Sequence, residues 1–112
     1  MTIGVIGQGY VGTAIKLGFQ DHYKVLTYDK FDLGKSTHSK ISDLVEETKV
    51  LFVCVPTPMR KDGTCYTGIV EEVIREINET AKDHIVVIKS TIPPGTTDRF
   101  HHEFSNVTVI FN

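Results

Sequence analysis

The chain has 112 residues, 40% apolar and 23% charged, a balance typical of one soluble globular domain with a single core. Its formal net charge of -2 provides no basic surface for nucleic-acid phosphates. No apolar run approaches the ~20 residues that span a bilayer, and the first predicted strand begins at Thr2, which leaves no room for a signal peptide. We therefore expect a cytoplasmic protein that binds neither nucleic acid nor membrane.

Strand and helix patterns alternate from one end of the chain to the other. Short apolar runs predict strands at residues 2–6, 23–28, 49–55, 85–89 and 107–111. Helices are predicted at residues 11–20, 42–48, 67–81 and 96–103, the last with Thr96 as its N-cap. Because such alternation gives right-handed crossovers, we expect one α/β domain over residues 1–112, a Rossmann-type parallel sheet with helices on both faces.

Two predicted elements carry a pattern that indicates how they are buried. Residues 50–55, "VLFVCV", contain no charged residue and predict a strand covered on both faces. The helix at 67–81 has an apolar stripe that should face the sheet, formed by Ile69, Val70, Val73, Ile74 and Ile77. Its other face is acidic and solvated, with one supporting pair between Glu71 and Arg75.

The segment "GVIGQGYVGTAI" places three glycines in G-x-G-x-x-G spacing between the first strand and the first helix. Gly7 permits a tight turn, Gly9 lets the backbone approach a pyrophosphate, and Gly12 lets helix and strand pack closely. The helix N-terminus would add unpaired N–H groups and a partial positive charge. The spacing therefore predicts a dinucleotide site, although a glycine-rich turn without a ligand is the alternative.

Asp29 ends the second predicted strand, 22 residues after Gly7, where a carboxylate can accept hydrogen bonds from the adenosine ribose. A carboxylate there also repels a 2′-phosphate, so the sequence favours NAD over NADP. Lys30 and Lys35 lie near enough to weaken that exclusion. The alternative for Asp29 is a solvated turn residue.

Hydroxyls and prolines follow two of the predicted strands. The third strand runs into "VPTP" at residues 55–58, and the fourth into "STIPPG" at residues 90–95. Prolines cannot continue a ladder, so Thr57 and Thr91 should stand at the carboxyl edge of the sheet, where open α/β sheets bind ligands. Each threonine could instead satisfy its own turn.

No catalytic residue or metal site is evident. Cys54 and Cys65 lack a paired Cys or His motif, and we expect both thiols to be inert. The histidines His101 and His102 are adjacent on a helix and point in different directions, which excludes a shared metal.

The glycine turn, "VPTP" and the "STIPPG" strand end together resemble the N-terminal domain of the UDP-glucose/GDP-mannose dehydrogenase family, which oxidises nucleotide sugars to uronic acids with NAD. The resemblance covers nearly the whole chain. It implies that Tyr10 and Val11 lie with the three glycines along the dinucleotide and that Asp29 holds the adenosine ribose. It also places a group of residues near the nicotinamide ribose: Val55, Pro56, Thr57 and Thr91.

In the complete family enzyme, the resemblance implies, a cysteine captures the aldehyde as a thiohemiacetal and a second NAD takes the second hydride. That cysteine lies far downstream in the family, and neither Cys54 nor Cys65 has its setting. We therefore expect the chain to be the cofactor-binding fragment of a longer dehydrogenase, inactive alone, which meets the nucleotide sugar only with a downstream domain.

Two alternatives stay open at this point. The interval from Asp29 to Pro56 is shorter than the family usually has, which resembles the cofactor domain of hydroxyacid-type dehydrogenases. The chain could also be a stand-alone dinucleotide-binding or sensing module, since it carries no evident acid–base pair or nucleophile. The sequence names neither the sugar nor an oligomeric state.

Overall fold

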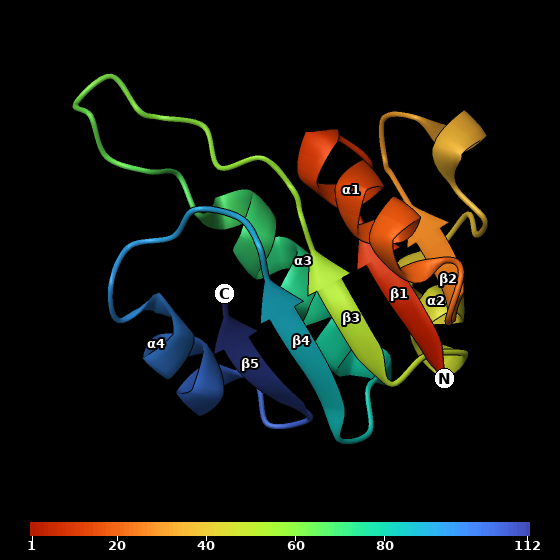
Figure 1. Ribbon diagram of the computed structural model, residues 1–112. Coiled ribbons are helices and arrows are strands. Elements are labelled where there is room, and N and C mark those ends of the chain that lie inside the picture. The colour runs from red at the N-terminus through yellow and green to blue at the C-terminus, as the bar shows by residue number, and fades with distance from the viewer.

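The computed structural model describes residues 1–112 as one five-stranded parallel sheet with helices on its faces (Figure 1). The strands are β1 (Thr2–Ile6), β2 (Lys24–Tyr28), β3 (Val50–Val53), β4 (His84–Ile88) and β5 (Val107–Phe111). The α-helices are α1 (Tyr10–Phe19), α2 (Ile41–Glu46), α3 (Gly68–Thr80) and α4 (Thr96–Glu103), with a short 3-10 turn, η1 (Leu33–Lys35), before α2. The predicted Rossmann-type fold is therefore confirmed.

Two local expectations are wrong. The third strand ends at Val53, two residues before the predicted end, because Pro56 lacks the N–H that a longer ladder would need. Thr96 is not an N-cap: Gly95 caps α4 with a φ of 85°, a conformation that favours glycine. Thr96 is instead the first helical residue, and its Oγ1 donates to the Pro93 carbonyl at 2.7 Å.

The strand order is β2-β1-β3-β4-β5, with every neighbouring pair parallel. The usual dinucleotide-binding order is 3-2-1-4-5-6, so this sheet lacks the strand that would lie beyond β2. The interval between β2 and β3 holds only η1 and α2. The short interval between Asp29 and Pro56 therefore contains no additional strand, and β2 is an edge strand of the sheet.

Hydroxyl groups cover part of that edge. The carbonyl oxygen of Thr27 in β2 accepts the backbone N–H of Thr37 at 3.0 Å. The Thr27 N–H in turn donates to Thr37 Oγ1 at 2.8 Å. Ser36 Oγ accepts the Asp29 N–H at 2.8 Å. These side chains take the ladder positions that a sixth strand would occupy, which leaves fewer unpaired groups for another chain to bind.

The two faces of the sheet are covered unequally. On one face α2, α3 and α4 enclose the hydrophobic core, a cluster of 17 buried residues that includes Leu44, Ile74 and Phe100. On the other face α1 contacts β1 and β2, with Phe19 against Phe52 at a ring distance of 5.6 Å. Figure 1 shows α1 in front of the sheet and α3 behind it.

Residues 50–55 are consequently not covered on both sides, contrary to the expectation from their apolar run. Leu51 and Val53 are fully buried against the core, whereas Val50 and Phe52 on the α1 face are only half-buried. The cause is the single helix on that face, which lies over β1 and β2 and reaches β3 through Phe19 against Phe52. No helix of the structure has the length and apolar character needed to cross a membrane.

Candidate functional site

The turn between β1 and α1 is built on two glycines that admit no side chain. Gly7 has a φ of 96°, and a Cβ there would lie 2.6 Å from the Cys54 carbonyl oxygen. A Cβ on Gly12 would lie 1.7 Å from the Gly7 carbonyl oxygen. These contacts bring the start of α1 against the ends of β1 and β3, so the helix N-terminus opens at the carboxyl edge of the sheet.

Gly9 differs from the other two glycines because a Cβ there would meet nothing within 4 Å. It is the N-cap of α1, and no side chain caps the helix. The first-turn N–H groups of α1 are thus directed at open space, in the arrangement that binds phosphate in dinucleotide-binding folds. Tyr10 and Val11 follow as exposed first-turn residues, and neither lines the cavity that Gly7 and Gly9 border.

Asp29 lies just beyond the end of β2, beside the glycine turn. Its Oδ2 accepts the backbone N–H of Gln8 at 2.8 Å, and its Oδ1 accepts the N–H of Phe31 at 2.9 Å. Each oxygen therefore has one fixed donor, and a carboxylate with about four acceptor positions keeps others free. The carboxylate is oriented before any ligand arrives, and it can accept hydrogen bonds from a pair of vicinal hydroxyls.

A cavity of about 440 Å³ joins these features. The glycine turn, through Gly7 and Gly9, forms one side together with Asp29, while Ile69 and Val73 of α3 face it from the other. Its size and mixed lining are those of a cofactor pocket. The cavity also explains why the apolar stripe of α3 divides: Val70, Ile74 and Ile77 are fully buried, but Ile69 and Val73 are only partly covered.

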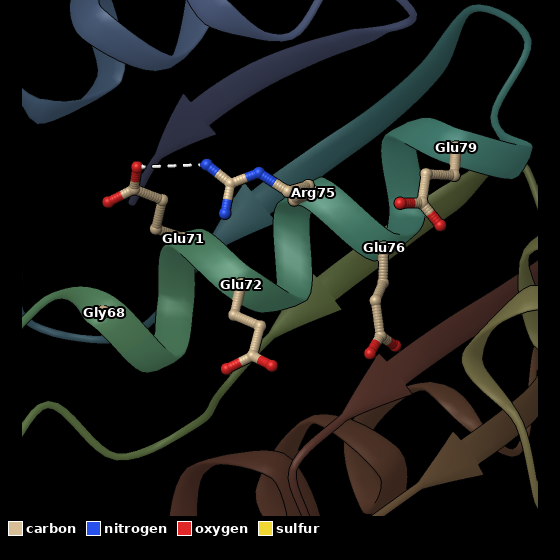
Figure 2. Close-up of a pocket in the computed structure, with 6 residues that line it drawn as sticks. All are labelled: Gly68, Glu71, Glu72, Arg75, Glu76 and Glu79. Carbon is tan, nitrogen blue, oxygen red and sulfur yellow. Dashed lines mark hydrogen bonds and ion pairs between the residues drawn. The ribbon is translucent and has the colours of Figure 1, made fainter.

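The rim of the cavity is charged. Lys30, Asp32 and Lys35 come from the segment after β2, and Glu72 and Glu76 come from α3. Figure 2 shows both glutamates extending from the side of α3 that is away from the ion-paired Glu71 and Arg75.

The predicted Glu71–Arg75 pair is present at 3.5 Å, but it is part of a larger network. Arg75 also lies 2.8 Å from Glu103 of α4, and Arg99 lies 3.4 Å from Glu71. These pairs join α3 to α4, so Glu71 and Arg75 serve packing. The α3 carboxylates that line the cavity are Glu72 and Glu76.

The strand-end threonines lie outside the cavity but close to each other. The Cys65 Sγ is 3.6 Å from the Thr57 carbonyl oxygen and 3.4 Å from that of Thr91. Ser90 Oγ donates to the Val55 carbonyl at 2.6 Å. The segments after β3 and β4 are thereby held together at the carboxyl edge, while of the predicted group only Val55 and Pro56 line the cavity.

The two thiols differ in setting. Cys54 lies one residue after β3 and lines the cavity, where burial raises the pKa of its thiol to about 11 despite the opposing charge of Lys89. A thiol with such a pKa is a poor nucleophile near neutral pH. Cys65 bridges the Thr57 and Thr91 segments as a weak donor.

Sequence reasoning missed several contributors. Gln8, buried between two glycines of the motif, supplies the N–H that orients Asp29, and Ser36 and Cys65 hold the edges of the site. Because the Gln8 contact uses its backbone N–H, the residue type at this position carried no signal for it. The contacts of Ser36 and Cys65 depend on tertiary packing and have no local pattern.

Comparison with known proteins places this arrangement in a family. Residues 28–109 match the model of the UDP-glucose/GDP-mannose dehydrogenase family, NAD binding domain. A UDP-N-acetyl-D-mannosamine dehydrogenase of Pyrococcus horikoshii is 30% identical over 137 aligned positions, covering 96% of this chain and 32% of the relative. That alignment is longer than this chain, so the relative carries residues that the chain lacks.

Solved structures agree. The GDP-mannose dehydrogenase of Pseudomonas aeruginosa, in a ternary complex, superposes with a TM-score of 0.83 at 26% identity, covering all of this chain and 36% of that one. A UDP-glucose dehydrogenase of Pyrobaculum islandicum gives a TM-score of 0.76 at 26% identity, over 98% of this chain and 34% of its own. The chain spans about a third of the length of these relatives. It belongs to the UDP-glucose/GDP-mannose dehydrogenase family and corresponds to the family's NAD-binding domain.

Proposed function

We propose that this chain supplies the cofactor half of a nucleotide-sugar 6-dehydrogenase, which converts UDP-glucose or a related nucleotide sugar to its uronic acid. The observation that carries the proposal is the fixed position of Asp29. Its carboxylate and the glycine turn that begins α1 both border one cavity, and these are the groups that hold an adenosine ribose and a pyrophosphate in dinucleotide-binding folds.

The residues present fit NAD. The uncapped N–H groups after Gly9 can bind the pyrophosphate, and Asp29 can accept hydrogen bonds from the ribose 2′- and 3′-hydroxyls. The apolar side chains of Ile69 and Val73 offer a surface for the adenine. Beyond the cavity, Thr57 and Thr91 mark the end where the nicotinamide ribose would lie.

When bound, NAD supplies the hydride acceptor for oxidation of the sugar alcohol. The chain's own contribution is to bind and orient the dinucleotide and to reject a 2′-phosphate through the charge of Asp29. The residues described here include no activated thiol, since Cys54 is held neutral by burial. Sugar binding and aldehyde capture would therefore come from further polypeptide, continuous with this chain or supplied beside it.

A second candidate is a stand-alone dinucleotide-binding module. It is favoured by the completeness of the cavity within 112 residues, because the glycine turn, Asp29 and α3 come from one chain. The two candidates share the cofactor site and differ only in whether catalysis follows.

The test is calorimetric titration of the chain with NAD, NADP and ADP-ribose. NAD and ADP-ribose should bind, and NADP should bind at least tenfold more weakly because of Asp29. Equal or tighter binding of NADP would contradict the assignment of Asp29. Absence of binding by NAD and ADP-ribose alike would contradict the assignment of the cavity.

A further inference from the structure

Phe31 presents an exposed aromatic ring at the cofactor cavity. It follows closely after Asp29, lines the cavity and is 83% exposed. Among the aromatic residues of the chain, only Tyr28 and Phe31 line this cavity. Tyr28 ends β2 and packs against the hydrophobic core. Phe31 therefore carries the one aromatic ring of the cavity that is free to meet a ligand.

Hydrogen bonds hold the turn that carries Phe31. Its backbone N–H donates to Asp29 Oδ1 at 2.9 Å, and the N–H of Asp32 donates to the Asp29 carbonyl oxygen at 3.3 Å. The Asp29 N–H in turn donates to Ser36 Oγ at 2.8 Å. The Phe31 backbone is therefore fixed beside the carboxylate assigned to the adenosine ribose before a ligand arrives, which lowers the ordering cost of a contact made by its ring.

The ring of Phe31 has a face available for stacking. No other aromatic ring pairs with it. The Nζ atom of Lys30 stands over one face at 5.8 Å from the ring centroid, near the outer limit of a cation–π contact. A flat partner can therefore stack on the opposite face without displacing a packed side chain, because the ring is largely exposed.

An apolar surface from a different segment lines the same cavity. Ile69 and Val73 lie one turn apart on α3, and both are only partly covered. The segment after β2 and α3 thus each contribute apolar side chains, and Asp29 lies on the side of Phe31. A flat aromatic base attached to a ribose fits this combination, because the base takes the apolar surfaces while the ribose hydroxyls reach the carboxylate.

From these contacts we infer that the ring of Phe31 stacks on the adenine base of the bound dinucleotide. The inference rests on the proposed function, which assigns Asp29 to the adenosine ribose, and it adds a further binding residue for the adjoining base. Stacking of a base on an aromatic side chain accounts for about 5- to 150-fold in affinity. Phe31 holds the adenine end of the cofactor and takes no part in hydride transfer.

Calorimetric titration of the chain with ADP-ribose tests the stacking, because this ligand keeps the adenosine and the pyrophosphate and lacks the nicotinamide. Phe31→Ala should raise the dissociation constant at least about fivefold. Phe31→Leu should also weaken binding, since it keeps an apolar side chain without a ring, whereas Phe31→Tyr should bind as the native chain does.

Leu33→Ala is the matched control for these variants. Leu33 is 64% exposed in η1 and does not line the cavity, so its replacement should leave the dissociation constant unchanged. Urea denaturation should give nearly the same midpoint for every variant, because the Phe31 and Leu33 side chains are both exposed. A loss of affinity in Phe31→Ala is then a loss of contact with the ligand.

A tryptophan reporter detects that contact directly. The chain contains no tryptophan, so Phe31→Trp introduces a single indole at the cavity. Saturating ADP-ribose should quench its fluorescence, because a base stacked on an indole quenches the emission. The fluorescence of Leu33→Trp should stay unchanged. A purely structural role of Phe31 would give no such difference between the two variants.

The outcomes separate this inference from the cofactor site itself. If the native chain and Phe31→Ala bind ADP-ribose equally, the stacking is overturned and the Asp29 site remains. Equal affinity of Phe31→Leu and the native chain would also overturn it, since an apolar contact without a ring would then suffice. Equal quenching in both tryptophan variants would contradict a contact specific to Phe31. Failure of the native chain to bind ADP-ribose would overturn the proposed function and this inference with it.

Discussion

The backbone N–H of Gln8 donates a hydrogen bond of 2.8 Å to the Asp29 carboxylate, which links the end of β2 to the glycine turn after β1. The two strands are neighbours in the sheet, with Ile6 opposite Tyr28 at the last register position. The Gly7 N–H continues the ladder to the Tyr28 carbonyl, also at 2.8 Å. The carboxylate is therefore positioned by the same strand pairing that shapes the phosphate-binding turn, so the two parts of the site cannot move independently.

Replacing Asp29 with asparagine should weaken NAD binding and abolish the preference over NADP. The substitution removes the charge and one acceptor oxygen, and loss of hydrogen bonds to a charged group costs about 10- to 100-fold in affinity. Calorimetric titration with both cofactors measures the effect. Asp32→Asn is the control, because Asp32 lies on the rim with only a long 3.9 Å pair to Lys35. An unchanged NAD preference in Asp29→Asn would refute the ribose assignment.

Gly9 and Gly12 should respond to substitution in opposite ways. Gly9→Val should abolish NAD binding and leave stability within about 0.5 kcal/mol, because the site is open and its φ of -74° suits any residue. Gly12→Val should cost several kcal/mol, since its Cβ would meet the Gly7 carbonyl oxygen at 1.7 Å. Urea denaturation and cofactor titration separate the two effects. Normal binding by a folded Gly9→Val chain would show that the pyrophosphate lies elsewhere.

The isolated chain should not reduce NAD with UDP-glucose or GDP-mannose. Aldehyde capture needs an activated thiol beside the substrate, and burial holds the Cys54 pKa near 11. Absorbance of NADH is the measurement, with the downstream portion of a family enzyme added in trans as the arm expected to restore turnover. Turnover by the chain alone that survives both Cys54→Ser and Cys65→Ser would reveal a mechanism that these residues do not explain.

Cys54 should make the fold less stable at high pH. Burial raises the pKa of its thiol from 9.0 to about 11, so the folded state favours the neutral form. That contribution is complete below pH 9.0 and is lost as the pH rises toward about 11. The difference in unfolding free energy between the native chain and Cys54→Ala should therefore shrink over this interval. A difference independent of pH would contradict the burial of Cys54.

The hydroxyl of Thr37 should contribute to the stability of the sheet edge. Thr37→Val leaves the N–H of Thr27 without its 2.8 Å acceptor, and Thr27 is fully buried. An unsatisfied buried N–H costs about 1–3 kcal/mol, so the midpoint of urea unfolding should fall by a corresponding amount. The neighbouring exposed Ser39 offers a control, since Ser39→Ala should be nearly neutral. Equal stability of the two variants would mean that water replaces the hydroxyl.

Local pattern was sufficient for most of the fold. Alternating apolar runs and a glycine-rich turn specify strands, helices and a parallel sheet, because each signal depends on residues close in sequence. The ends of β1, α4 and β5 agree with expectation to the residue. The steric need for Gly7 and Gly12 was also predictable, since a tight strand-to-helix turn excludes Cβ atoms wherever it occurs.

Only the tertiary structure decided the features that depend on how distant segments of the chain pack together. The pairing of Gln8 with Asp29 and the contact of Cys65 with Thr91 each join residues more than twenty positions apart. The partial exposure of Val50 and Phe52 depends on which helices cover each face of the sheet. An apolar strand predicts burial on both faces, yet the number of helices on each face is set by the order of the crossovers. Residues 50–55 could therefore not reveal that one face of their strand is only partly covered, because α1, the helix on that face, lies mainly over β1 and β2.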